Sequence, residues 1–125
     1  MAETIPSGIR LKNLIQNHHV EILGREKNND KFIHLYNIGS YWVAFERSAC
    51  LLGSISPQCE ISLFRVVDRP DYVVMASVPD DEAEAYFRKH LISRKRSDYK
   101  VLTVPPLPAG DYYRWHVDAV KSVMQ

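Results

Sequence analysis

Apolar residues recur at helical spacing near the start of the chain and then give way to β-prone runs. Leu11, Leu14 and Ile15 fall on one face of a predicted amphipathic helix, with polar residues on its other faces. Residues 20–23 and 31–38 are rich in β-branched and aromatic side chains, and a polar turn cluster separates the two runs. The N-terminal part of the chain is therefore predicted to form a helix followed by two strands.

A further strand is predicted at residues 41–45, because alternate side chains of this apolar run face opposite sides. At least one of the two sides must belong to the core. Residues 46–52 indicate a helix, and Gly53 is expected to end it in a left-handed conformation.

The next strands are predicted at residues 60–67 and 72–78, and the second is apolar at most positions, as is typical of a strand buried on both faces. Pro79 opens the clearest helix. Acidic residues occupy its first turn, and basic residues as far as Arg94 suit its C-terminal end.

The chain closes with a predicted strand at residues 99–104, a proline-rich break, and a helix from Asp111 through Val123. This order of elements indicates an α/β domain. We expect a mixed sheet of about five to six strands that is flanked by helices.

Composition favours one domain that spans residues 1–125, because a chain of this length has room for one hydrophobic core. The hydrophobic fraction of 46% and the charged fraction of 25% are ordinary for globular proteins. The N-terminus lacks the features of a secretion signal, and no apolar run has the length of a membrane span. The protein is therefore expected in the cytoplasm, with no membrane partner.

No motif of a catalytic centre is recognisable in the sequence. The five histidines lack metal-ligand spacing, and neither a phosphate-binding loop nor a nucleophile elbow is present. Cys50 and Cys59 are expected to be reduced and buried thiols. One alternative is a nuclease that holds a divalent ion with Glu60, Asp68 and Asp71. Otherwise the chain is predicted to be non-enzymatic, without cofactor or metal.

The strongest charge feature is a basic stretch at residues 88–100. It contains six Lys or Arg and one Asp, a net charge of +5 in a protein whose formal net charge is +1. Its cations are predicted to contact phosphates: Arg88, Lys89, Arg94, Lys95, Arg96 and Lys100. The alternative interpretation is a solvated helix end. The aromatic run 112–116 is able to stack on bases, although such runs more often pack a terminal helix on a sheet.

Two separated motifs resemble the N-terminal, DNA-sampling domain of the MutS mismatch-repair proteins. Residues 36–45, Y-N-I-G-S-Y-W-V-A-F, precede a predicted helix and are similar to the family's M-G-D-F-Y-E-L-F, which a helix also follows. Residues 75–79, M-A-S-V-P, are similar to the family's M-A-G-I-P. Four residues then stand at the family's offsets: Glu84, Tyr86, Lys89 and Leu91.

The resemblance covers roughly residues 8–104 and leaves 105–125 as a C-terminal extension. It implies the mixed α/β sheet of the MutS domain. In that family an aromatic ring is inserted beside a mispaired base, and a glutamate hydrogen-bonds the base. Tyr41 stands at the ring position and Val43 at the glutamate position. The family's ATPase domain has no counterpart in this sequence.

Two functions are compatible with these features. The first is a stand-alone module that binds nucleic acid, DNA rather than RNA, with Tyr41 as a stacking probe and the basic stretch on phosphates. This function requires that Tyr41 and the cations lie on the same solvent-accessible side of the domain. The alternative is a protein-interaction adaptor for a nucleic-acid-processing protein. The adaptor would keep the fold but would no longer recognise DNA. It would expose an apolar patch around Tyr41, Val43 and the terminal aromatics.

Overall fold

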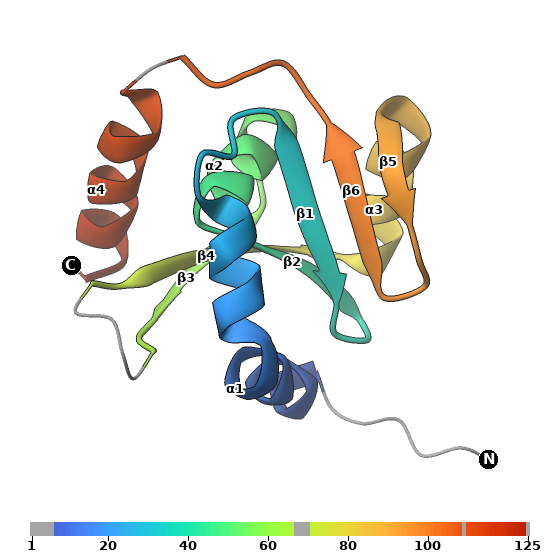
Figure 1. Ribbon diagram of the computed structural model, residues 1–125, viewed down its shortest axis with the longest axis horizontal. Helices are drawn as coiled ribbons and strands as arrows, with labels where there is room; N and C mark the ends of the chain where they lie inside the picture. Colours follow the sequence, from blue (N-terminus) through green and yellow to red (C-terminus); the bar gives the residue numbers. More distant parts are fainter. Residues whose placement is uncertain (1–6, 67–70, 109, 125) are drawn as a thin grey trace.

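The computed structural model describes residues 7–66, 71–108 and 110–124, which form a six-stranded sheet with helices on both faces (Figure 1). The helices are α1 (Ser7–Glu26), α2 (Glu46–Ile55), α3 (Asp80–Lys89) and α4 (Asp111–Met124). The strands are β1 (Phe32–Asn37), β2 (Tyr41–Phe45), β3 (Glu60–Phe64), β4 (Val73–Pro79), β5 (Leu91–Lys95) and β6 (Tyr99–Thr103). The predicted α/β class is confirmed.

The sheet has the order β3-β4-β2-β1-β6-β5, and every pair of neighbouring strands is antiparallel. We expected a mixture of parallel and antiparallel pairs. Helix α2 connects β2 to β3, and helix α3 connects β4 to β5. The two strands of each connection run in the same direction, but at least one other strand lies between them in the sheet. Parallel strands are therefore present without being adjacent.

Both faces of the sheet are buried. On one face Trp42 and Leu102 pack with Phe87 of α3 and with residues of α2. On the other face Val43 and Phe45 pack beneath α1. Figure 1 shows α1 in front of the sheet, with α2 and α3 behind it and α4 beside β3. Because β2 is covered on both sides, its residues 42–45 are all buried, whereas Tyr41 at its start is exposed.

Residues 20–23 belong to α1, so the prediction of a strand there was wrong. Ile22 and Leu23 follow Ile15 by seven and eight residues, which is the helical repeat, and all three pack in the cluster beneath α1. Val20 points to solvent and is 74% exposed. The β propensity of Val and Ile is a weak preference, and the packing of one long amphipathic helix outweighs it.

The helix that follows Pro79 ends at Lys89, whereas the sequence predicted helix as far as Arg94. The His90 N–H still donates to the Tyr86 carbonyl at 3.1 Å, but His90 itself has an extended backbone. The chain then forms β5, an edge strand that the sequence analysis missed. Basic residues suit a helix C-terminus and an exposed sheet edge alike, so their charge did not distinguish the two.

Helix α2 continues through Gly53 to Ile55, so Gly53 does not end it as predicted. Among the described glycines, positive φ angles occur at Gly39 and Gly110. The end of α2 is instead formed by Ser56, whose N–H donates to the Leu52 carbonyl at 2.8 Å.

The two cysteines are unpaired, with Cys50 buried on α2 and Cys59 half-buried before β3. Burial raises the pKa of Cys50 to about 11. Its thiol is therefore protonated at neutral pH, as expected of a structural residue.

Glu46 connects α2, β4 and α4 from a strained position at the end of β2. Its φ is 52°, a left-handed value that non-glycine residues rarely adopt. One carboxylate oxygen accepts a hydrogen bond from the Val74 N–H at 2.8 Å and lies 3.3 Å from His116 Nε2. The other accepts the Tyr112 hydroxyl at 3.0 Å. These contacts fix α4 against the sheet.

A second carboxylate, that of Glu26, joins the end of α1 to the start of α2 and is 4% exposed. Its Oε1 accepts the Ser48 N–H at 2.8 Å and Asn29 Nδ2 at 3.1 Å, while Oε2 accepts the Ser48 hydroxyl at 2.7 Å. Burial raises the pKa of Glu26 from 4.5 to about 7, although the hydrogen bonds act in the opposite direction. The folded state therefore binds the proton more tightly than the unfolded state, and stability is lost as pH rises through this interval.

We expect Glu26→Gln to remove this contribution to the pH dependence. The amide oxygen keeps the two N–H contacts. The amide nitrogen donates to Ser48 Oγ in place of Asn29 Nδ2, which keeps its hydrogen bond to the Phe32 carbonyl at 2.7 Å, and the Ser48 hydrogen turns to the same carbonyl at 3.3 Å. In urea unfolding between about pH 5 and pH 8, the variant should gain roughly 2–3 kcal/mol relative to the wild type as pH rises. A constant difference between the two proteins across this range would contradict the assignment.

Candidate nucleic-acid interface

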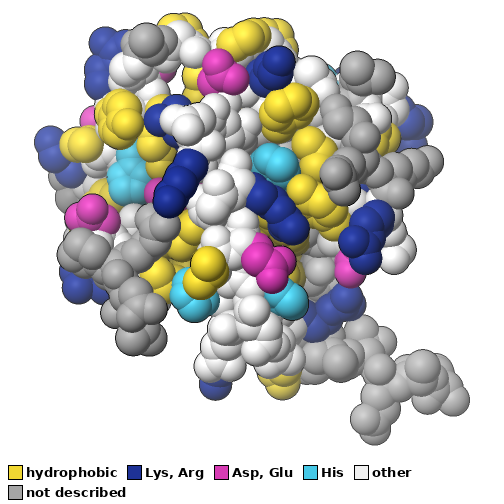
Figure 2. Space-filling view, in the orientation of Figure 1, with side chains coloured by type: hydrophobic (Ala, Val, Ile, Leu, Met, Phe, Trp, Pro, Cys, Tyr) yellow, Lys and Arg dark blue, Asp and Glu magenta, His cyan; other side chains and the backbone are white. Residues whose placement is uncertain are grey.

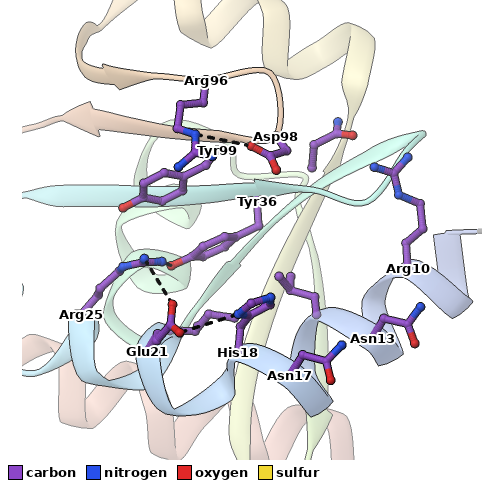
Figure 3. Close-up of a pocket in the computed structure, with 13 residues that line it drawn as sticks. Arg10, Asn13, Asn17, His18, Glu21, Arg25, Tyr36, Arg96, Asp98 and Tyr99 are labelled. Atoms are coloured by element: carbon purple, nitrogen blue, oxygen red, sulfur yellow. Dashed lines mark hydrogen bonds and ion pairs between the residues drawn. The ribbon is translucent and has the colours of Figure 1, made fainter.

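A groove of about 420 Å³ lies between α1 and the sheet, near the turns that follow β1 and β5 (Figure 3). Arg10 and Arg25 enter it from the two halves of α1, and Arg96 enters from the turn between β5 and β6. Two amide side chains of α1, Asn13 and Asn17, also line it. We refer to this feature as the α1 groove.

Aromatic rings form the floor of the α1 groove. Tyr36 and Tyr99 are cross-strand partners on β1 and β6, and their rings stack with centroids 5.2 Å apart. The Arg25 guanidinium lies 4.9 Å from the Tyr99 ring centroid, and its Nη1 donates to the Tyr36 hydroxyl at 3.0 Å. His34 stacks on Tyr99 as well, with Nδ1 2.8 Å from the Tyr99 hydroxyl. The stack therefore holds the head group of Arg25 in a defined place.

Two groups of this aromatic stack remain neutral at physiological pH. Burial, reinforced by the charge of Arg25, lowers the pKa of His34 to about 4. Burial also raises the pKa of the Tyr36 phenol above its ordinary value. The positive charge of the floor therefore comes from Arg25, because a guanidinium stays protonated throughout this range.

The acidic residues of the α1 groove compensate its arginines only weakly. Glu21 lies 3.8 Å from Arg25, and Asp98 lies 4.0 Å from Arg96. The two carboxylate side chains are 63% and 64% exposed, and exposed ion pairs contribute at most about 1 kcal/mol. Arg10 has no carboxylate within ion-pair distance in the described ranges. An incoming anion can therefore engage the arginines at little cost.

The surface around the α1 groove has no uniform charge. Figure 2 shows Lys and Arg side chains scattered among acidic, hydrophobic and histidine side chains on this side of the molecule. Any attraction for an anionic polymer must therefore come from the groove itself, because long-range steering needs a larger field of one sign.

Tyr41 lies on the same face of the sheet as the α1 groove. Side chains two residues apart on a strand point to the same face, so Tyr41 lies on the face of Val43, which is buried beneath α1. Tyr41 is at the start of β2 and pairs with Pro79 of β4. The side chain is 41% exposed. The Asn37 N–H donates to the Asp98 carbonyl at 2.9 Å, which sets the turn that carries Arg96 beside this end of β1.

The apolar patch that the adaptor hypothesis expects around Tyr41, Val43 and the terminal aromatics is not formed. Val43 is 0% exposed, so the residue that the resemblance assigns to the base-reading position faces the core. Tyr112 is buried and Trp115 packs against the core beneath α2. Tyr113 is exposed, but it lies on α4, far from the turn between β5 and β6 (Figure 1).

Arg88, Lys89 and Lys100 lie on the face opposite to Tyr41. The Lys100 Nζ is 5.0 Å from the centroid of the Trp42 ring and 4.1 Å from that of Phe87, and both rings belong to the core beneath α2 and α3. Arg88 and Lys89 are exposed on α3, which covers that face. The expectation that Tyr41 shares one side with these cations was therefore wrong, because alternation along β6 turns Lys100 away from the groove.

Among the described Lys and Arg side chains of the predicted basic stretch, Arg96 alone lines the α1 groove. The side chains of Arg94 and Lys95 lie outside what the structure describes. Sequence reasoning missed Arg10 and Arg25, because it divided α1 into a helix and a strand.

A signal for the missed residues exists in the sequence. Arg10, Asn13 and Asn17 are spaced by three and four residues, so they share one stripe of a helix. This stripe lies next to the apolar positions Leu11 and Leu14, which places it at the margin of the buried face.

No group of three or more His, Cys, Asp or Glu is arranged to hold a metal ion within the ranges that the structure describes. Of the acids named for the nuclease alternative, Glu60 lies on β3, Asp71 lines a groove beside α4, and Asp68 lies outside the described residues. None of the described helices combines the length and hydropathy that crossing a bilayer requires.

Comparisons of this chain with models of protein families, with curated proteins and with solved structures found no match. The similarity to the MutS domain therefore remains a prediction from two sequence motifs, and a function has to be inferred from the geometry of the site.

Proposed function

We propose that this chain is a non-catalytic module that binds nucleic acid through the α1 groove and Tyr41. The observation that carries the proposal is that Arg10, Arg25 and Arg96 enter one groove with an aromatic floor. Guanidinium groups bind phosphate with two parallel hydrogen bonds, which fixes the orientation of the bound strand. The preference for DNA over RNA follows from the resemblance to the MutS domain.

The spacing of the arginines suits several phosphates of one strand. Arg10 and Arg25 are fifteen residues apart on α1, which corresponds to about 22 Å along the helix axis. A single phosphate is too small to engage both, whereas a strand that follows α1 meets them at different nucleotides. Asn13 and Asn17 lie between them and can donate further hydrogen bonds to the backbone.

Tyr41 adds a ring that can stack on a base at the end of this path. An exposed aromatic side chain can wedge at a weak base step, where the cost of unstacking is lowest. Val43 is buried, so it makes no contact with the base. The module is therefore expected to sense unstacked or poorly paired bases by stacking, without the hydrogen bond that the family's glutamate supplies.

The second candidate function is a protein-interaction adaptor. It is favoured by exposed apolar side chains on α4, at the edge of the sheet away from the groove: Tyr113, Val117, Val123 and Met124. This surface is separate from the α1 groove, so the two functions do not exclude each other.

We expect the double substitution Arg10→Gln and Arg96→Gln to weaken binding of labelled DNA roughly tenfold or more at low salt. Each lost phosphate contact should also reduce the slope of log affinity against log salt by about 0.9 on duplex DNA. Fluorescence anisotropy with single-stranded, paired and mismatched oligonucleotides measures both quantities. The matched control is Arg88→Gln with Lys89→Gln, which removes the same charge from the opposite face.

The control variant should bind as the wild type does. If both double variants lose the same affinity, attraction is a matter of net charge and the assignment to the α1 groove is wrong. If the wild type shows no salt-dependent binding to any of the three probes, the proposed function is wrong.

Tyr41→Ala should lose about 1–3 kcal/mol of binding free energy on single-stranded or mismatched DNA, where a base is available for stacking. The loss on fully paired DNA should be small, because its bases stay stacked with one another. Tyr113→Ala removes another exposed tyrosine and serves as the control. Equal affinity of Tyr41→Ala and the wild type for all probes would exclude Tyr41 as a probe.

A further inference from the structure

Helix α4 has apolar side chains on two different sides. On one side Tyr112 is buried and Trp115 packs against the core. A second line is formed by Tyr113, Val117, Val120 and Met124, with spacings of four, three and four residues. This is the spacing of the seam between two packed helices. We call these four residues the α4 stripe.

Three of the four residues of the α4 stripe are exposed to solvent, and Val120 is half-buried. Tyr113 is 65% exposed, Val117 is 51% exposed and Met124 is 60% exposed. Single exposed apolar residues are normal on a protein surface, but a line of them on one helix marks an interaction site. Hydrophobic side chains are visible over α4 at the left edge of Figure 2.

A groove of about 290 Å³ connects the helix to the adjoining chain. It is lined by Tyr113 and Val117 of the stripe and by Tyr72 before β4, and polar side chains also line it: Glu46, Asp71 and His116. A partner seated on the stripe would therefore also contact the tyrosine ring of this neighbouring segment.

Basic side chains flank the α4 stripe. Arg114 and Lys121 lie on one edge of it, one position after Tyr113 and Val120, and both are exposed. Arg114 also forms an exposed ion pair with Asp111 on its own helix, and exposed ion pairs of this kind are weak. At its N-terminal end the Arg47 guanidinium lies 5.6 Å from the Tyr113 ring, and Lys27 lines a groove with the same ring. Asp118 lies further round the helix, on the far side of the basic edge.

These charges disfavour a second copy of this chain as the occupant. An antiparallel pair of α4 helices would stack Tyr113 of each copy on Met124 of the other, and would place Arg114 of each copy beside Lys121 of the other. A parallel pair would place Lys121 of one copy beside His116 or Val123 of the other, without an opposite charge. Neither arrangement pairs the basic edge with an acid of the other copy, and juxtaposed like charges oppose association.

We propose that the α4 stripe docks one amphipathic helix of a different protein, whose apolar seam is bordered by Asp or Glu on the edge that faces Arg114 and Lys121. The apolar side chains of the two helices interdigitate, while the acidic border of the partner pairs with the basic edge of α4. Charge then selects the partner and its orientation, and burial of the stripe supplies the affinity.

Two synthetic peptides of roughly three heptads, with the same leucine seam and with either Glu or Lys at the flanking positions, serve as probes. We expect the Glu-flanked peptide to bind the full chain at least about tenfold more tightly than the Lys-flanked peptide at low salt. Val117→Asp should abolish binding of the Glu-flanked peptide. Val20→Asp, at another exposed apolar position on α1, should leave it unchanged and controls for added charge.

Equal affinity for the two peptides, or equal loss in the two variants, would overturn the proposal. Sedimentation of the free protein tests whether a second copy of the chain covers the stripe instead. A wild-type dimer that becomes monomeric in Val117→Asp would show this and overturn the proposal. DNA binding by Val117→Asp should match that of the wild type, so failure of this proposal is distinguishable from failure of the α1 groove.

Discussion

The carboxylate of Glu46 is the contact on which the arrangement of helices and sheet depends. A left-handed backbone at a glutamate costs about 1–3 kcal/mol, and the hydrogen bonds to Val74 and Tyr112 offset that cost. The buried Glu26 lies close enough for Glu46 to raise its pKa further. Tyr41 lies at one end of β2, and both carboxylates lie at the other end, where α1 ends and α4 begins. The anchoring of the helices is thus separated from Tyr41, whereas Glu46 also lines the groove beside the α4 stripe.

Most of the fold was predictable because hydrophobic spacing reports local geometry. The strands at β1, β2, β3, β4 and β6 and the helices α2, α3 and α4 follow from alternation, helical repeats and turn residues. The errors arose where two local preferences compete: residues 20–23 have β-prone side chains in a helical repeat, and the basic residues of β5 also suit a helix end. Packing against the sheet decides both cases, and packing is not visible in a short window of sequence.

The candidate site was harder to predict than the fold because it depends on which face each side chain takes. The basic stretch and Tyr41 were recognisable from their chemistry, but one residue of register decides whether a cation of β6 faces α1 or α3. Lys100 faces the α3 side, and Tyr99 next to it faces α1. Arg25 enters the groove because α1 is long enough to carry it over the stacked tyrosines. Which of these side chains meet in the groove depends on the tertiary structure, so the sequence could predict only the types of residue involved.

The pairing of β1 with β6 has a consequence for the order of folding. Phe32 pairs with Thr103, so this central contact closes a loop of more than half the chain. Loop closure of this kind is entropically costly, and it follows the formation of local hairpins such as β1 with β2. The stack of Tyr36 on Tyr99 crosses that late junction. We therefore expect the floor beneath Arg25 to be assembled among the last parts of the domain, and a partly folded chain to lack it.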